Sequence, residues 1–374
     1  MLKKASWLLI GLPYLLFAQT SNLFNSGYEE YFRNSLDGAE EAFKKAIEQE
    51  GDVALYHLYL GKTYHRKGEE EKAKKSLLEA VRLDSKEKRA YLLLGEIYFA
   101  EESFKEAEVY YKKAVELEPI SFDGHFKLGQ VYLKFQEPDK AIYHLMKADE
   151  IEKDVSWVFF YLGQAYLGKD YKTSAIGAFN RAIMLESNNP LFYYWRGNGY
   201  FSSADYNSPN DNDFHSADDY RMSIEFGLST PACYFMYGNT LLNRGFYHLK
   251  TERQNEALDY FETAIVKYKK VLSLDSSASN AYNNIGLAYF YLDRIDEAVA
   301  SYKKAIELEP TIAFFHDNLG DAYYKKSLFD KALSEWSLVY ELDPNYVTDG
   351  GYFPLPQKSI KEKIREAKRR CQQD

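Results

Sequence analysis

Residues 90–119 read AYLLLGEIYFAEESFKEAEVYYKKAVELEP and contain two helical patterns in succession. In the first half, four residues recur at steps of three and four, as they do along one face of an α-helix: Tyr91, Leu94, Gly95 and Tyr98. In the second half, Ala107, Tyr111 and Ala114 follow a small, large, small pattern, and Pro119 ends it. The stretch therefore predicts two helices joined by a short turn.

The glycine of this stretch recurs along the chain. Nine glycines follow one another at steps of 34 residues, apart from one step of 41 and one of 48: Gly27, Gly61, Gly95, Gly129, Gly163, Gly197, Gly238, Gly286 and Gly320. Glycine inside a helix costs roughly 0.5–1 kcal/mol relative to alanine, so nine such positions need a local cause. We expect a neighbouring helix to approach closely at each glycine, which predicts a stack of repeated helix pairs.

The residues around each glycine resemble the tetratricopeptide repeat, in which W-x2-L-G-x2-Y is followed by A-x3-F and then P over 34 residues. The eighth copy carries the same slots: Tyr282, Ile285, Gly286, Tyr289, Ala298, Tyr302, Ala305 and Pro310. The resemblance implies an all-α fold, a right-handed α-solenoid of helix-turn-helix units with a C-terminal capping helix. The nine repeats are expected at 20–53, 54–87, 88–121, 122–155, 156–189, 190–230, 231–278, 279–312 and 313–346. It also implies a non-catalytic scaffold or adaptor, whose concave groove binds an extended peptide or partner segment.

The first 18 residues differ from the repeats. Lys3 and Lys4 precede an apolar run from Ala5 to Phe17, and small Ala18 follows it. This order is typical of a secretory signal peptide, and the run is shorter than the roughly 20 residues that a membrane span needs. We therefore expect an exported protein, periplasmic or secreted, with a retained anchor as the alternative.

The charge of the chain limits its partners. A formal net charge of -9 at pH 7 argues against nucleic acid as the main partner. One strongly basic stretch lies in the tail 347–374, between Lys358 and Arg370, where Ile360, Ile364 and Ala367 also form an apolar stripe at helical spacing. We interpret this tail as a loop and a capping helix with a solvated basic face; a membrane surface or an acidic partner is the alternative.

The two long repeats predict different insertions. The seventh repeat has 14 extra residues, which add seven residues, close to two turns, to each helix if the two share them equally. Both apolar faces then stay in register, and a lengthened hairpin results. The extra residues of the sixth repeat fall at 207–213, where Pro209 and several Asn and Asp indicate an open loop.

An alignment of the first helices gives the candidate binding site. In the resembled family the concave positions lie three residues before, one after and four after the glycine. Repeats four to seven place there an aromatic, an amide and an apolar residue: Phe126, Gln130, Leu133; Phe160, Gln164, Leu167; Tyr194, Asn198, Phe201; and Phe235, Asn239, Leu242. Amides both donate and accept hydrogen bonds, which suits the backbone of an extended peptide, and Trp157, Tyr161 and Trp195 add to the aromatic wall. The alternative is ordinary packing between adjacent helices.

Repeats eight and nine are polar and acidic at the corresponding positions. These residues include Asn284, Asp317 and Asp321, with Asn280, Asn283 and Asn318 beside them. One hypothesis places a basic residue or the amino terminus of a partner there, and the other treats the residues as solvated surface. The Lys, Asn and Arg set with which some members of the family bind a terminal carboxylate is missing.

The sequence offers little for catalysis, metal or cofactor binding. The seven histidines are scattered, and those at 57, 125 and 316 occupy a large packing slot. The acidic stretch from Asp205 to Asp213 lacks the Gly and terminal Glu of a calcium loop. We therefore expect no enzyme activity, no metal and no cofactor. Cys233 and Cys371 leave their oxidation state open.

Two other functions remain open at this stage. An exported glycan-handling protein could stack sugar rings on the same aromatics. A subunit of a cell-envelope complex could instead be bound through its outer surface.

Overall fold

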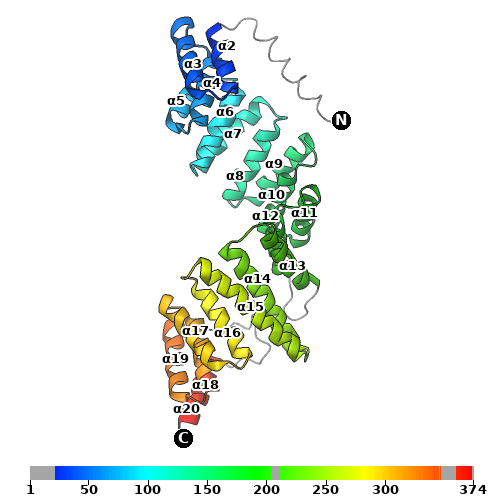
Figure 1. Cartoon of the computed structure of the whole chain (residues 1–374), viewed down its shortest axis with the longest axis vertical. Coiled ribbons are helices and arrows are strands. Elements are labelled where there is room, and N and C mark those ends of the chain that lie inside the picture. Colours follow the sequence, from blue (N-terminus) through cyan, green and yellow to red (C-terminus); the bar gives the residue numbers. More distant parts are fainter. Residues whose placement is uncertain (1–21, 204–210, 345, 347–358, 373–374) are drawn as a thin grey trace. The chain divides into compact units, whose positions relative to one another are not determined.

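The computed structural model describes residues 22–203, 211–344, 346 and 359–372. Within these residues the chain forms 19 helices, α2 to α20, and no strand (Figure 1). The all-α prediction is therefore confirmed. The predicted signal peptide and residues 205–210 of the acidic stretch lie outside the described residues. The open-loop prediction was wrong for 211–213, because α13 begins at Asp211.

The chain divides into two compact units, Met1–Gly168 and Lys169–Asp374, called here the N-terminal and C-terminal units. The N-terminal unit contains α2 (Asn22–Phe32), α3 (Leu36–Glu50), α4 (Ala54–Arg66), α5 (Glu70–Leu83), α6 (Lys88–Ala100), α7 (Phe104–Leu117), α8 (Phe122–Lys134), α9 (Pro138–Ile151) and α10 (Ser156–Gly168). Consecutive helices of this unit pack against each other, as expected for helical hairpins stacked in chain order.

The C-terminal unit continues the pattern. It contains α11 (Lys172–Leu185), α12 (Pro190–Ser203), α13 (Asp211–Glu225), α14 (Pro231–Lys250), α15 (Gln254–Leu274), α16 (Ser279–Tyr291), α17 (Ile295–Leu308), α18 (Ala313–Lys325), α19 (Phe329–Leu342) and α20 (Ile360–Cys371). The helix that carries a repeat glycine is called a first helix: α2, α4, α6, α8 and α10 in the N-terminal unit, and α12, α14, α16 and α18 in the C-terminal unit. Within each unit, neighbouring first helices contact each other and so form one shared face.

The repeat glycines permit the close approach that their spacing predicts. A Cβ atom on Gly95 would lie 2.5 Å from the ring of Tyr111, and one on Gly286 would lie 2.6 Å from the ring of Tyr302. Both rings are almost completely buried. In each of these repeats, therefore, an aromatic ring of the second helix fills the space that the missing side chain leaves.

The lengthened hairpin of the seventh repeat is confirmed. α14 has 20 residues and α15 has 21, against 13 and 14 for α16 and α17. The additional turns repeat the glycine contact, because Gly245 meets the ring of Phe261 as Gly238 meets that of Tyr268. An insertion of seven residues in each helix thus preserves the packing register.

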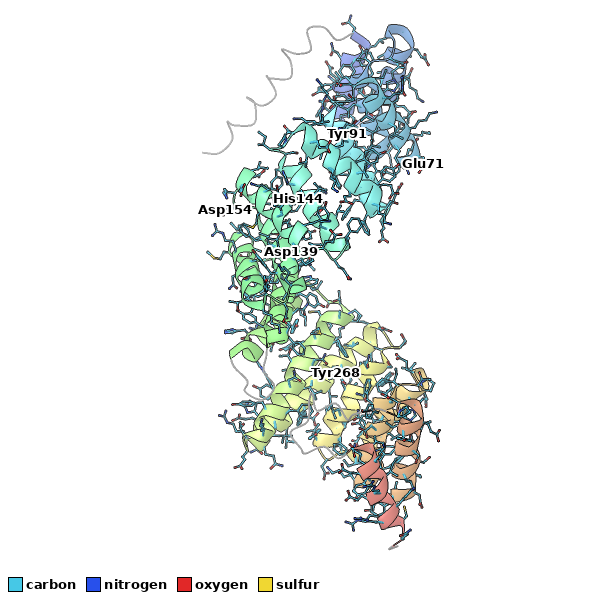
Figure 2. The ribbon with its side chains drawn as sticks, turned by 180° about the vertical axis from the view of Figure 1, so that it is seen from behind. Glu71, Tyr91, Asp139, His144, Asp154 and Tyr268 are labelled. Carbon is cyan, nitrogen blue, oxygen red and sulfur yellow. The ribbon has the colours of Figure 1, made fainter. Side chains whose placement is uncertain are left out.

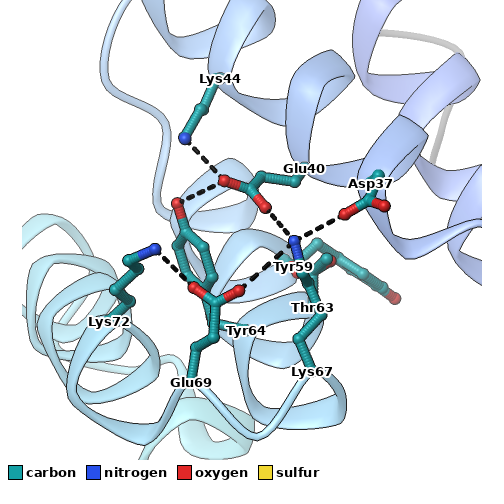
Figure 3. Close-up of polar contacts among 9 residues, drawn as sticks. All are labelled: Asp37, Glu40, Lys44, Tyr59, Thr63, Tyr64, Lys67, Glu69 and Lys72. Carbon is teal, nitrogen blue, oxygen red and sulfur yellow. Dashed lines mark hydrogen bonds and ion pairs between the residues drawn. The ribbon is translucent and has the colours of Figure 1, made fainter.

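Polar contacts between successive hairpins add to the apolar packing. The Tyr64 hydroxyl donates to Glu40 at 3.2 Å, and Lys67 lies within 2.7 Å of Asp37, 2.5 Å of Glu40 and 3.4 Å of Glu69 (Figure 3). Burial raises the pKa of Glu40, but hydrogen bonds from Lys44 and Lys67 outweigh it and hold the pKa at about 2. The charge of Lys67, at the turn of the second repeat, is therefore compensated by carboxylates of the chain.

Helix α20 packs against α19 at the end of the stack, as the fold prediction requires. Its N-terminus carries a capping box, in which Ser359 accepts from the backbone of Glu362 and the Glu362 side chain accepts from the backbone of Ser359. Ile360 and Ala367 are buried, whereas the basic residues Lys368 to Arg370 are exposed. Among the described residues, no helix combines the length and the apolar character needed to cross a membrane.

Candidate functional site

Aromatic residues of α8 and α10 meet on the first-helix face of the N-terminal unit. The rings of Phe122 and Phe126 stack with their centroids 5.4 Å apart, and Phe126 meets Tyr161 edge-on at 5.6 Å. The Trp157 ring lies 6.1 Å from Tyr161. All four side chains are half-buried. These four residues, called the aromatic surface, are brought together as the sequence alignment predicts for Phe126, Trp157 and Tyr161; Phe122 was missed.

The other candidates of these two helices divide between surface and core. Gln130 lies close enough to the Tyr161 hydroxyl to lower its pKa, which burial raises, and Leu133 is half-buried. Gln164 is half-buried too, and it makes no hydrogen bond to any residue that the structure describes. Phe160 is only 4% exposed, so its ring belongs to the core and offers a partner little surface.

In the C-terminal unit, the predicted amides bind buried tyrosines of the second helices. On α12, the Asn198 Oδ1 accepts from the Tyr220 hydroxyl at 2.7 Å, beside half-buried Tyr194 and Trp195. On α14, the Asn239 Oδ1 accepts from the Tyr268 hydroxyl, also at 2.7 Å. Each tyrosine hydroxyl fixes its amide with the oxygen directed inward. Phe201 and Phe235 are half-buried on the same two helices, and Leu242 is buried.

The amide network extends across three first helices. Asn284 of α16 donates to Asn239 at 3.0 Å and accepts from Asn283 at 3.2 Å, and Asn318 of α18 donates to Asn283 at 2.8 Å. The series Asn239, Asn284, Asn283 and Asn318 is called the amide chain; Tyr268, at its end, is labelled in Figure 2. The polar groups of this face therefore satisfy much of each other's hydrogen-bonding capacity.

The acidic candidates at the end of the stack bind the chain's own last helix. The Lys363 ammonium of α20 lies 2.7 Å from Asp317 and 2.7 Å from Asp321. Burial raises the pKa of Asp321 to about 6, although Lys363 acts in the opposite direction. Asp317 is 5% exposed. The position expected for a basic group of a partner is thus taken by Lys363, and binding of a partner there stays a prediction.

A cavity of about 270 Å³ opens on the first-helix face of α2, α4, α6 and α8, and the sequence analysis missed it. Its lining residues are Tyr31, Lys62, His65, Arg66, Arg89, Leu92, Leu93, Glu96 and Asp123. It is called the basic cavity. The sequence contained enough information to find this cavity. Tyr31, Lys62 and His65 occupy, in the first two repeats, the same concave positions that the alignment used in repeats four to seven.

Two histidines that looked scattered in the sequence are neighbours in the fold. The Nδ1 atoms of His125 and His144 lie 2.9 Å apart, and His144 is labelled in Figure 2. Burial lowers the pKa of His144 to about 4, with His125 adding to the effect. A metal centre needs more ligands than this pair provides, and the described residues contain no group of three or more His, Cys, Asp or Glu that could hold a metal ion.

Neither Cys233 nor Cys371 forms a disulfide in the structure. Cys233 is buried in α14, where burial raises the pKa of its thiol to about 11, and Cys371 is half-buried at the end of α20. A raised pKa makes the reactive thiolate scarce at neutral pH, so Cys233 is a packing residue.

Models of the tetratricopeptide repeat match residues 24–88, 238–278 and 279–312, and a model of the TPR repeat matches residues 95–135. The chain belongs to the tetratricopeptide repeat (TPR) family. The match at 279–312 has the same bounds as the eighth repeat expected from the sequence. The TPR family and the fold together support a protein–protein interaction scaffold.

Several solved structures are similar to this TPR chain. The C-terminal part of a TPR repeat-containing protein from Cytophaga hutchinsonii has 18% identity and a TM-score of 0.51, over 70% of this chain and 99% of that chain. At this identity the likeness shows the fold alone. A MamA protein has 30% identity and a TM-score of 0.42, over 44% of this chain and 91% of that chain. A tetratricopeptide repeat protein from Parabacteroides merdae has 16% identity and a TM-score of 0.49, over 71% of this chain and 97% of that chain. The comparison with curated proteins gave no match.

Proposed function

We propose that this TPR chain is a non-catalytic, exported scaffold that binds an extended segment of a partner protein on its first helices. The family and the fold support the scaffold. Within residues 3–18, charged residues come first, an apolar run follows and a small residue ends the segment. This order supports export to the periplasm or secretion. The aromatic surface on α8 and α10 supports the location of the binding site.

The aromatic surface is the observation that carries the proposal. Two neighbouring first helices bring Phe126, Trp157 and Tyr161 together, and each ring keeps part of its surface in water. Large rings with a polar edge are enriched in protein interfaces, because they bury much apolar area at a small cost in side-chain entropy. Gln130 lies beside them and can bond a peptide backbone.

The C-terminal unit contributes oriented donors. Because the Oδ1 atoms of Asn198 and Asn239 accept from tyrosine hydroxyls, the amide nitrogens are the groups left to act as donors. Neither nitrogen donates to another residue within the described part of the chain. A carbonyl oxygen of an extended segment is a suitable acceptor, and fixing the amides in advance reduces the entropy lost on binding.

Site-specific photocrosslinking in the native host tests the proposal. A photoreactive amino acid replaces Gln130 in one variant and Asn198 in another, and the control variant carries it at Val109, which is 63% exposed on the second helix α7. We expect one protein to be crosslinked from the first-helix positions and not from Val109. The captured protein is then purified and titrated against the full chain.

A pair of aromatic substitutions completes the test. Trp157→Ala should weaken binding of the purified partner at least tenfold, whereas Tyr143→Ala, which removes a 57% exposed ring from the second helix α9, should leave it unchanged. Equal effects of the two substitutions, or capture of glycan in place of protein from position 130, would overturn the proposal.

A further inference from the structure

The basic cavity contains a cation that forms no ion pair with any described residue. Lys62 is half-buried, and its ammonium lies 5.1 Å from the ring centroid of Tyr59. No carboxylate among the described residues lies within ion-pair distance of it. Lys67, five residues later, has three such partners in Asp37, Glu40 and Glu69 (Figure 3). Lys67 is therefore part of a network of ion pairs, whereas Lys62 is not.

The neighbouring arginines are already held in place. Arg89 forms two hydrogen bonds of 2.7 Å with Glu87, and Arg66 donates to the Tyr31 carbonyl oxygen at 2.9 Å and lies over the Tyr31 ring. Both guanidinium groups add positive potential to the cavity, and each already bonds to groups of the chain. Lys62 makes no hydrogen bond or ion pair among the described residues. Burial lowers the pKa of Lys62 and Arg89 lowers it further, with Glu87 and Glu96 acting in the opposite direction, so a bound anion would relieve the remaining cost.

A buried hydroxyl next to the cavity also has no partner. Tyr111 packs against Gly95, and its hydroxyl oxygen makes no hydrogen bond within the described residues. In the sixth and seventh repeats the corresponding tyrosines, Tyr220 and Tyr268, donate to the amide that follows the glycine. The third repeat has Glu96 at that position, and Glu96 lines the cavity. In the third repeat, therefore, the tyrosine hydroxyl lacks the hydrogen bond that it forms in the sixth and seventh repeats.

We propose that the basic cavity binds the carboxylate of an Asp or Glu side chain in the partner segment, with Lys62 as the contacting residue. The inference rests on the proposed function in placing that segment on the first helices. Lys62 has no ion-pair partner, so a single carboxylate suffices to compensate it, whereas the double charge of a phosphate would meet Glu96 and Asp123, which also line the cavity. Leu92 and Leu93 supply an apolar wall for the methylene groups of the incoming side chain.

Carbodiimide crosslinking with defined peptides tests this site directly. The probes are acetylated and amidated Ala-Tyr-Glu-Tyr-Ala, the same peptide with Gln in place of Glu, and the Gln peptide with a free C-terminus. We expect the Glu peptide to form an amide bond with Lys62, at least tenfold more than with Lys75, an exposed lysine of α5. The Gln peptide should not react there. Equal labelling of Lys62 and Lys75, or labelling by the free C-terminus alone, would overturn the side-chain assignment.

Substitution of Lys62 separates binding from structure. Lys62→Met keeps an unbranched apolar side chain and removes the charge, and Lys75→Met is the matched control. We expect Lys62→Met to abolish the preference for Glu over Gln in a binding titration and to raise the melting temperature of the full chain, because it removes a half-buried charge without a partner. A lowered melting temperature would show that Lys62 is structural and would contradict the proposal.

The two proposals can fail separately. The peptide assays depend on Lys62, which lies on α4, and the crosslinking and Trp157→Ala assays depend on α8, α10 and α12. If the unsubstituted chain showed no preference for the Glu peptide over the Gln peptide while position 130 still captured a partner, the basic-cavity proposal would be wrong and the aromatic-surface proposal would stand.

Discussion

The first-helix faces of the two units use their polar residues in opposite ways. In the C-terminal unit, Lys363 forms ion pairs with Asp317 and Asp321, and the residues of the amide chain bond to one another. In the N-terminal unit, Lys62 has no carboxylate partner among the described residues, although the helix geometry is the same. A repeat fold therefore sets where a polar side chain lies, and the neighbours decide whether it is satisfied. Unsatisfied groups are the better guide to a binding site, because burial without a partner costs free energy.

Among the variants that test this contrast, substitution of Lys363 should change the free energy of unfolding most. Lys363→Met leaves two neighbouring carboxylates without their cation, and we expect a loss of about 3 kcal/mol of unfolding free energy at pH 8 in urea titrations. The deficit should shrink at pH 5, because the Asp321 carboxyl, whose pKa is already about 6, takes up a proton. Lys368→Met, on the exposed side of the same helix, should change stability by less than about 0.5 kcal/mol. A deficit that is independent of pH would show that packing, and not charge, makes Lys363 important.

The glycine contacts should show no difference between the units. Gly95→Ala places a Cβ atom 2.5 Å from the Tyr111 ring, and Gly238→Ala places one 2.6 Å from the Tyr268 ring. We expect each to cost about 2 kcal/mol by overpacking, measured by chemical denaturation. Gly177→Ala is the control; it lies on α11 with no described atom within 4 Å of the added Cβ, and it should gain about 0.5 kcal/mol. Unequal costs at Gly95 and Gly238 would mean that packing also differs between the units.

Two tyrosines in the same repeat slot sharpen the polar comparison. Tyr268→Phe removes the hydroxyl that bonds Asn239, and we expect a loss of about 1 kcal/mol. Tyr111→Phe removes a hydroxyl without a partner among the described residues, so stability should stay the same or rise. The two variants are compared in the same urea titration. A similar loss for both would indicate that the Tyr111 hydroxyl is bonded in solution, for example to water.

The smallest expected effects come from two histidines, His316 and His144, whose contributions to stability depend on pH in opposite directions. In His316, burial would lower the pKa, but hydrogen bonds with Glu335 and the Pro310 carbonyl raise it overall. Its stabilisation is full below the unfolded pKa and is lost as the pH rises through the folded one. His144 has a depressed pKa of about 4, so its stabilisation is lost as the pH falls from about 6.5 towards 4.

Thermal melts from pH 4 to 8 measure both slopes. His316→Gln should remove the loss on the alkaline side, and His144→Gln should remove the loss on the acidic side. If His144→Gln left the acidic slope unchanged, carboxylates elsewhere in the chain would be its cause.

The sequence predicted the features that depend on spacing along the chain. The 34-residue steps predicted the helix pairs, the glycines predicted the close approach of a neighbouring helix, and the 14 extra residues predicted about two added turns in each of α14 and α15. These features follow from local periodicity, because residues three or four apart share a helix face. The apolar stripe in the tail likewise predicted that α20 packs with its basic side exposed.

The polar partners could not be predicted in this way. Lys363 reaches Asp317 across 46 residues, and Asn318 reaches Asn283 across 35, so each contact depends on how separate helices pack. Three residues of the aromatic surface, Phe126, Trp157 and Tyr161, were predictable because they lie on the first helices of two adjacent repeats, close to the concave positions. The basic cavity was missed because the alignment began at the fourth repeat and so left out Tyr31, Lys62 and His65, which occupy the same concave positions in the first two repeats.

The doubled contact of the seventh repeat suggests how this architecture changes its width. Gly245 and Phe261 repeat the contact of Gly238 and Tyr268, displaced by seven residues along each helix of the hairpin. A hairpin of this kind can grow outward in modules of two turns while its base stays unchanged. The same rule offers a route to engineering: paired heptads could be deleted from, or added to, α14 and α15 to vary the projection without redesigning the stack.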